Sequence, residues 1–293
     1  MSSFLQNYQR QPKLFIDLPS KGTWYDESII EGEQYVQIPV FGMNAMDEIM
    51  FKTPDALYSG DATANVIKSC IPTILDPWKL VGFDIDYVLI AIRIATYNDS
   101  MPVTSSCPMC SHLNESVLSL TRMIQNYENY KIENTFSIDD LTFNIRPISY
   151  KQMTDFSTEN YSYERQLYQS AQSDELTEQQ KDKITKEIFQ KTNDLNLRVA
   201  ISYISSVSNS TDSETNLNAI TEFVVNNDAK FYSMLQTTIF DLTNQWKVPK
   251  ITIKCGGVLE EGKECNHEYS SKVELDYSNF FGLKFLHSRN LIS

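Results

Sequence analysis

The stretch Thr104-Ser-Ser-Cys-Pro-Met-Cys-Ser-His112 contains two cysteines, Cys107 and Cys110, separated by two residues, and leads into Val117-Leu-Ser-Leu120. Pro and Ser around the pair are typical of a turn, and the partial alternation that follows is typical of a strand. The stretch therefore predicts a knuckle, the tip of a β-hairpin from which both sulfurs can reach one metal ion. Ser111 stands where such knuckles usually have Gly.

A second cysteine pair, Cys255 and Cys265, lies near the other end of the chain. The alternating Ile251-Thr-Ile-Lys-Cys255 enters it, and Cys265-Asn-His-Glu-Tyr269 leaves it towards Val273-Glu-Leu275. Nine residues separate these two cysteines, so the glycines among them must fold the excess into a bulge. We expect a second β-hairpin knuckle here.

Two facing knuckles supply four thiolates, which is the ligand set of a tetrahedral structural zinc ion. We therefore predict zinc bound by Cys107, Cys110, Cys255 and Cys265. A disulfide protein is disfavoured, because five cysteines are few and odd in number and we expect no secretory signal. A thioredoxin-like pair would begin a helix after a strand, and a catalytic zinc would keep an open position; both remain as less favoured alternatives.

Three further residues, two histidines and a fifth cysteine, have other candidate roles. His112 and His267 lie beside the knuckles, and each could replace a cysteine as a ligand, although four cysteines already fill the shell. Cys70 lies on an apolar helical stretch, which predicts a small core residue.

The composition limits the classes of function. The chain has 293 residues, 41% of them hydrophobic, which is enough for a core and two or three lobes. No apolar run approaches the roughly 18 residues that cross a bilayer, so no membrane span is expected. The net charge of −13 opposes phosphate backbones, so nucleic acid is not an expected partner and proteins are.

Further elements are predicted on both sides of the first knuckle. Residues 13–18 and 35–40 predict a strand pair, Asn44 and Asp47 a helix start, and residues 53–60 a short helix. Asp84 is expected to cap a buried helix through Tyr97, and Leu141–Ile145 alternates like a strand. Capping boxes at Thr177 and Thr211 predict two antiparallel helices joined by a polar turn over residues 205–210.

No enzyme motif survives inspection. The run from Gly257 to Glu264 resembles a phosphate-binding loop, but Glu264 replaces the Ser or Thr that would hold magnesium. The deaminase order of His-x-Glu before Pro-Cys-x-x-Cys is absent from the sequence. Asp84 with Asp86, and Asp139 with Asp140, have no basic or nucleophilic partner in the pattern, so capping and turn roles are favoured.

Several strings together resemble a known family. They are Met46-Asp-Glu48, Lys52-Thr-Pro-Asp-Ala-Leu-Tyr-Ser-Gly60, Ile67-Lys-Ser-Cys-Ile-Pro72, Asp86 to Tyr97, the Cys-Pro-x-Cys knuckle and Asp276-Tyr-Ser-Asn-Phe-Phe-Gly282. In the windows 44–120 and 250–283 the chain resembles the baseplate hub subunit family of T-even-type, contractile-tailed bacteriophages. The resemblance implies no catalysis, partners among other baseplate and tail proteins, and a place in the virion baseplate after assembly in the host cytoplasm. It leaves open a structural subunit or a transient hub-assembly chaperone.

The expected fold is α+β, with an N-terminal α/β lobe, a split zinc ribbon and an inserted antiparallel helical hairpin. The predicted segments are residues 1–100 for the lobe, 101–150 and 247–278 for the two ribbon halves, 151–246 for the helical insertion and 279–293 for a C-terminal interaction tail. That tail is aromatic and mildly basic, so it could dock on a neighbour or pack on its own domain.

Overall fold

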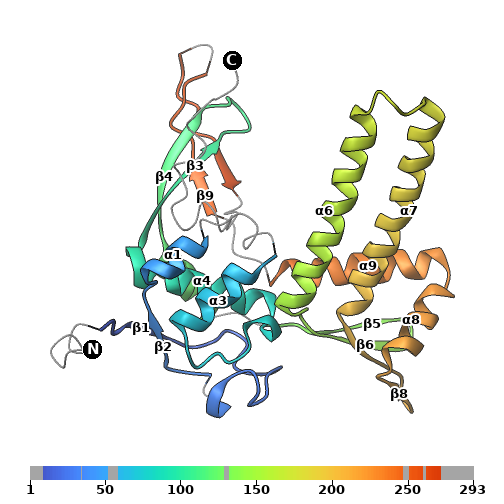
Figure 1. Cartoon of the computed structure of the whole chain (residues 1–293), viewed down its shortest axis with the longest axis horizontal. Helices are drawn as coiled ribbons and strands as arrows, with labels where there is room; N and C mark the ends of the chain where they lie inside the picture. The colour runs from blue at the N-terminus through green and yellow to red at the C-terminus, as the bar shows by residue number, and fades with distance from the viewer. Residues whose placement is uncertain are drawn as a thin grey trace. The chain divides into compact units, whose positions relative to one another are not determined.

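The computed structural model describes residues 9–33, 35–51, 59–128, 132–246, 251–259 and 262–271. Residues 53–58 of the short helix predicted at 53–60, the predicted strand at 273–275 and the tail at 279–293 lie outside these residues. The chain forms two compact units, one from Met1–Tyr130 with Val248–Ser293 and one from Lys131–Lys247. Both combine helices with small antiparallel sheets, so the α+β class is confirmed (Figure 1).

The first unit begins with a strand pair and continues into helices. Strand β1 (Pro12–Ile16) pairs antiparallel with β2 (Ile38–Phe41), as predicted. Asn44 begins the first helix, because its Oδ1 accepts hydrogen bonds from the N–H groups of Met46 and Asp47 at 2.8 and 3.0 Å. In its described residues the helical elements are η2 (Glu31–Glu33), α1 (Ala45–Phe51), α3 (Asp61–Cys70), η3 (Pro77–Lys79), α4 (Gly82–Tyr97) and α5 (Leu120–Glu128).

Helix α4 is the centre of this unit's core. Its residues from Tyr87 to Ile92 are all buried, which covers more than a full turn, so the prediction of a helix buried on nearly every side is confirmed. The predicted cap is wrong, because the helix begins at Gly82 and Asp84 lies inside its first turn. The Asp84 carboxylate instead accepts hydrogen bonds from the Ser20 N–H at 3.1 Å and the Tyr25 hydroxyl at 2.6 Å. It holds the turn that follows β1 against the helix.

The buried Asp84 gives the stability of this unit a pH dependence. Burial raises the pKa of Asp84 to about 6, although the hydrogen bonds from Ser20 and Tyr25 oppose the rise. A carboxyl whose pKa is higher in the folded state binds protons more tightly there, so its contribution to stability falls as the pH rises from about 4 to 6. Over the whole titration, from well below pH 4 to well above pH 6, this contribution to the free energy of unfolding changes by about 3 kcal/mol. Asp84→Asn should flatten this part of the curve of unfolding free energy against pH.

The matched control is Asp140→Asn, which removes an exposed carboxylate. Its pH curve should follow that of the wild type. Denaturant unfolding at several pH values gives the free energy of unfolding of the wild type and of both variants. If this free energy changes equally with pH in Asp84→Asn and in the wild type between pH 4 and 6, the expectation is wrong.

The second unit contains a four-stranded antiparallel sheet in the order β5-β6-β7-β8. Helices α6 and α7 run side by side in opposite directions as a helical hairpin (Figure 1). Capping boxes begin both helices, Ser149 with Gln152 and Thr177 with Gln180, and the second of these was predicted. The elements are β5 (Thr135–Ile138), β6 (Leu141–Ile145), α6 (Tyr150–Gln172), α7 (Glu178–Ser202), β7 (Ile204–Ser208), β8 (Ser213–Glu214), α8 (Leu217–Val225) and α9 (Ala229–Asn244).

The sequence predicted that α7 pairs with a helix beginning at Thr211, and this prediction is wrong, because α7 pairs with α6. The expected polar turn at 205–210 is mostly strand β7, which pairs with β6 through Phe143 opposite Val207. The box at Thr211 begins no helix; Asn216 caps α8 and Asp228 caps α9. The serines of this segment resemble a polar turn in the sequence, but in the structure their hydroxyls form hydrogen bonds within the sheet. The Ser205 hydroxyl, for example, donates to the Asn144 carbonyl at 3.0 Å. Sheet pairing in the folded chain outweighs the local turn propensity.

Candidate metal centre

Two β-hairpins in the first unit place the four predicted cysteines at their tips. In the first hairpin β3 (Ser100–Ser106) pairs with β4 (Leu113–Ser119), and its last pair is Ser106 opposite Leu113. In the second hairpin β9 (Ile251–Lys254) pairs with β10 (Glu268–Ser271), and its last pair is Lys254 opposite Glu268. Cys107 and Cys255 are therefore the first residues after the paired strands, and the strand register determines where their thiols lie.

The first knuckle is a tight turn held by main-chain hydrogen bonds. The Cys107 N–H donates to the His112 carbonyl at 2.9 Å, and the Ser111 N–H donates to the Cys107 carbonyl at 2.8 Å. The Met109 N–H lies 3.4 Å from the Cys107 Sγ and donates to it. Ser111 has φ 58°, the left-handed conformation that Gly adopts without cost, so the serine accepts strain at this position.

The second knuckle repeats this geometry despite its wider spacing. The Cys255 N–H donates to the His267 carbonyl at 2.9 Å, and the Gly257 N–H donates to the Cys255 Sγ at 3.3 Å. Asn266, in the position that corresponds to Ser111, has φ 48°. The two knuckles are thus locally equivalent.

The two described ends of the insertion in the second knuckle, residues 258–259 and 262–264, lie side by side. The Cys265 N–H donates to the Gly257 carbonyl at 2.8 Å, and Val258 forms an isolated antiparallel bridge with Glu264. Because these contacts bring the two ends of the insertion together, Gly257 and Cys265 lie next to each other, as the sequence neighbours Met109 and Cys110 do in the first knuckle. The spacing of nine residues is therefore compatible with a Cys-x-x-Cys geometry that carries an insertion.

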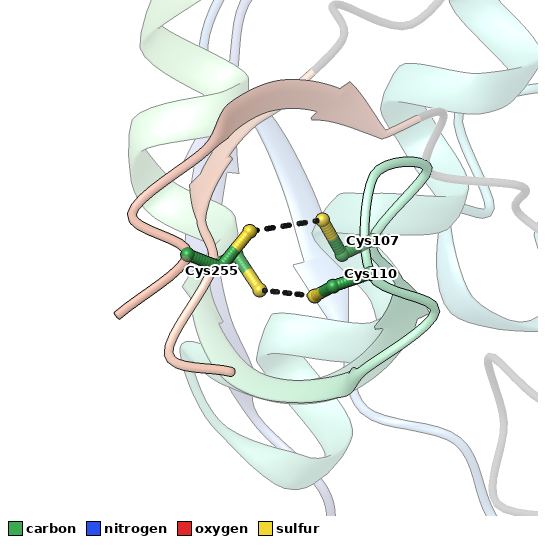
Figure 2. Close-up of side chains that lie close together, drawn as sticks. Cys107, Cys110 and Cys255 are labelled. Atoms are coloured by element: carbon green, nitrogen blue, oxygen red, sulfur yellow. Dashed lines mark hydrogen bonds between the residues drawn. The ribbon is translucent and has the colours of Figure 1, made fainter. Parts of the chain in front are cut away.

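The four sulfurs converge between the hairpins. Figure 2 shows Cys107 and Cys110 from the first hairpin facing Cys255 from the second. The Sγ atoms of Cys110 and Cys255 are 3.5 Å apart, those of Cys107 and Cys265 are 3.9 Å apart, and all four lie within 4.8 Å of one another. A disulfide requires about 2.05 Å, whereas two sulfurs on one tetrahedral zinc ion are about 3.8 Å apart. The donor set and its spacing fit a zinc ion.

The two histidines contribute main-chain rather than side-chain groups to this arrangement. Among the described residues, the cluster of candidate metal ligands contains the four cysteines and neither His112 nor His267. The His112 side chain is exposed, and the His267 ring stacks on Tyr269 with centroids 6.2 Å apart. That the four cysteines are the ligands, with neither histidine among them, stays a prediction.

Without a cation, the surroundings of the cluster favour the ionised form of Cys255 but disfavour that of Cys110. Desolvation disfavours ionisation of Cys255, but donors including the Gly257 N–H and the Asn114 amide outweigh it and lower the pKa of Cys255 to about 6. At Cys110 a hydrogen bond from His112 favours the thiolate, yet desolvation and the other thiols raise its pKa to about 12. Four adjacent thiolates therefore need a bound cation to balance their charge.

The remaining cysteine lies elsewhere in the first unit. Cys70, the last residue of α3, is fully buried, and its Sγ is 3.9 Å from an Asp47 oxygen. Burial raises the pKa of Cys70 to about 12, which keeps it a neutral thiol. The prediction of a core residue is confirmed.

Two residues of the site were not singled out by sequence reasoning. In the sequence, Gly257 belongs to a predicted bulge and to a rejected phosphate-loop match, yet a Cβ added there would lie 2.5 Å from the His112 Cβ and 3.1 Å from the Cys110 Sγ. Asn114 is a buried polar residue between the exposed Leu113 and Glu115 of β4. The available signal was its inward position in the strand alternation next to a knuckle.

The fold and the site together define a class: mixed α+β proteins in which two distant β-hairpins meet at a four-cysteine cluster. The model of a family described as T4 bacteriophage base plate protein matches residues 43–281. The chain therefore belongs to the T4 bacteriophage base plate protein family. Neither the comparison with curated proteins nor the comparison with solved structures gives a match.

Family membership has consequences for location and partners. A base plate family implies a place in the virion tail and partners among tail proteins. In the described part of the chain, no helix is both long and apolar enough to cross a membrane.

Proposed function

We propose that Cys107, Cys110, Cys255 and Cys265 bind one structural zinc ion. The observation that carries this proposal is the convergence of four sulfurs, at 3.5 and 3.9 Å across the two pairs, from knuckles with equivalent main-chain geometry. Four protein ligands complete a tetrahedral shell and leave no position for a catalytic water. The ion's role is then mechanical.

Such an ion would hold together two hairpins that are distant in the sequence. About 140 residues lie between Cys110 and Cys255, and closing a flexible loop of that length costs on the order of 4 kcal/mol plus a constant. Structural zinc sites have apparent binding energies of about 10 to 16 kcal/mol, so the ion can hold both ends together. The second hairpin has four-residue strands in a two-stranded sheet, which is marginal by itself. Zinc supplies the stability that this hairpin lacks.

Cobalt substitution tests the ligand set. The protein loaded with Co²⁺ should show the visible and sulfur-to-metal absorption of a tetrahedral four-thiolate site, with one metal per chain. The reason is that all four donors are soft sulfurs and none is water or histidine. A spectrum of an open site with water or histidine ligands would contradict the proposal.

For the whole chain we propose a non-enzymatic role in the central hub of the baseplate, bound to other tail proteins. Membership in the base plate family supports this role, and so does a cysteine cluster whose chemistry is architectural. The net charge of −13 favours protein partners over nucleic acid. The same features are compatible with an assembly chaperone that leaves before the virion matures.

Quantitative mass spectrometry of purified virions and of hub intermediates separates these roles. A structural subunit is present in both at a fixed ratio to known hub proteins, whereas a transient chaperone is present in the intermediates alone. Absence of the chain from both would overturn the hub proposal.

A further inference from the structure

The Asn114 side chain lies between the two hairpins, where it contacts both knuckles. It belongs to β4 of the first hairpin and is 7% exposed. Its Oδ1 accepts a hydrogen bond from the Gly256 N–H of the second knuckle at 2.8 Å. A main-chain N–H can only donate, so this bond determines which end of the amide carries the oxygen and which carries the nitrogen.

The nitrogen end of the amide faces the candidate metal centre. Asn114 Nδ2 lies 3.5 Å from the Cys255 Sγ, 3.1 Å from the Tyr269 hydroxyl and 3.2 Å from the His112 carbonyl. The Tyr269 hydroxyl in turn lies 2.7 Å from the Ser105 hydroxyl of β3. One buried amide therefore joins the ligand Cys255, the strand β10 and the turn of the first knuckle.

We propose that Asn114 is the positioning residue that assembles the second knuckle on the first and holds Cys255 ready as a metal ligand. This proposal rests on the zinc site proposed above. Hydrogen bonds from the surroundings orient metal ligands and tune their donor strength. Asn114 provides both effects, because its oxygen places the main chain next to Cys255 while its nitrogen donates to the sulfur itself.

The first hairpin is consequently the template of the site. Its strands are seven residues long and are joined by a turn of six residues, so it forms from local contacts. The second hairpin has shorter strands and reaches the first through Asn114, through Tyr269 and through the proposed metal. Loss of the Asn114 amide should therefore weaken metal binding even though no ligand is removed.

Two substitutions of Asn114 separate its two ends. Asn114→Asp keeps the acceptor for Gly256 but removes the donor and places a carboxylate against the sulfur of Cys255. Asn114→Ala removes both ends. We expect Asn114→Asp to lower metal affinity by about 10- to 100-fold, and to shift the sulfur-to-cobalt absorption because the Cys255 sulfur loses a donor. Asn114→Ala should have at least as large an effect on affinity.

The measurement is a Co²⁺ and Zn²⁺ titration of the full chain in competition with a chelator, together with the absorption spectrum. Glu115→Gln is the matched control, since this neighbour on β4 is exposed and its substitution removes a charge without contacting the site. It should keep the affinity and the spectrum of the wild type. If Asn114→Ala fails to fold, the nearly isosteric Asn114→Asp decides.

The outcomes distinguish this proposal from the zinc site itself. A wild-type chain that binds no metal through four thiolates overturns the zinc site. A wild-type chain with a four-thiolate spectrum, combined with an Asn114→Asp variant of unchanged affinity and unchanged spectrum, overturns the role of Asn114 alone. A lower affinity with a shifted absorption in Asn114→Asp, and neither in Glu115→Gln, supports it.

Discussion

Replacing Cys107 by serine should abolish tight metal binding and make the thermal stability of the protein insensitive to zinc. Serine offers a hard hydroxyl in place of a soft thiolate, and the fifth thiol of the chain, Cys70, cannot replace it because it is buried in α3. Metal that binds only the folded state stabilises it by mass action, so its loss should cost several kcal/mol, or a fall in melting temperature on the order of 10 °C.

Calorimetry with and without a chelator measures this effect, and Cys70→Ala is its control. The wild type and Cys70→Ala should both lose stability when the metal is removed, although truncation of a core residue lowers the starting stability of Cys70→Ala. Cys107→Ser should start low and stay there. If neither chelation nor Cys107→Ser changes the melting curve, the four sulfurs hold no structural metal.

Gly257→Ala should disrupt the site without altering any ligand. The added methyl group would lie 2.5 and 2.7 Å from the Cβ and Cγ of His112 and 3.1 Å from the Cys110 Sγ. The first two distances are far inside van der Waals contact, so the knuckles must move apart. Overpacking of this kind costs about 1 to 3 kcal/mol, and here it acts directly on the distance between Cys110 and the second pair. Metal affinity should fall together with the melting temperature.

The adjacent glycine provides a matched control. A Cβ at Gly256 would meet only the Asn114 Oδ1, at 3.9 Å, which is an ordinary contact. Gly256→Ala should therefore bind metal nearly as well as the wild type. Equal affinities for the two alanine variants in the chelator competition would show that the knuckles do not approach as closely as the structure places them.

The second unit shows where local patterns mislead. The capping box at Thr177 determined a helix start correctly, because Gln180 is three residues away and the interaction is local. The similar pattern at Thr211 lies instead in the turn before β8, with the Thr211 hydroxyl bonded to Asn209 and Asp212. The same polar side chains satisfy a turn as readily as a helix end, so tertiary pairing decides between them.

Asp84 gives a second example of the same limit. Its position shortly before a long apolar helix predicted a cap, and the helix itself was identified correctly because its apolar residues extend round every face. The carboxylate is used by Ser20 and Tyr25, about 60 residues away in the sequence. Such a partner leaves no periodic signal near Asp84.

The amino-acid sequence by itself determined the two knuckles, the buried α4 and the four candidate ligands, because strand alternation, helical periodicity and cysteine spacing are local patterns. Only the tertiary structure decided that the two pairs face each other and that Gly257 and Asn114 join the knuckles. These features depend on contacts across about 140 residues of chain. Close approach and hydrogen-bond geometry at that separation exist only once both hairpins have folded.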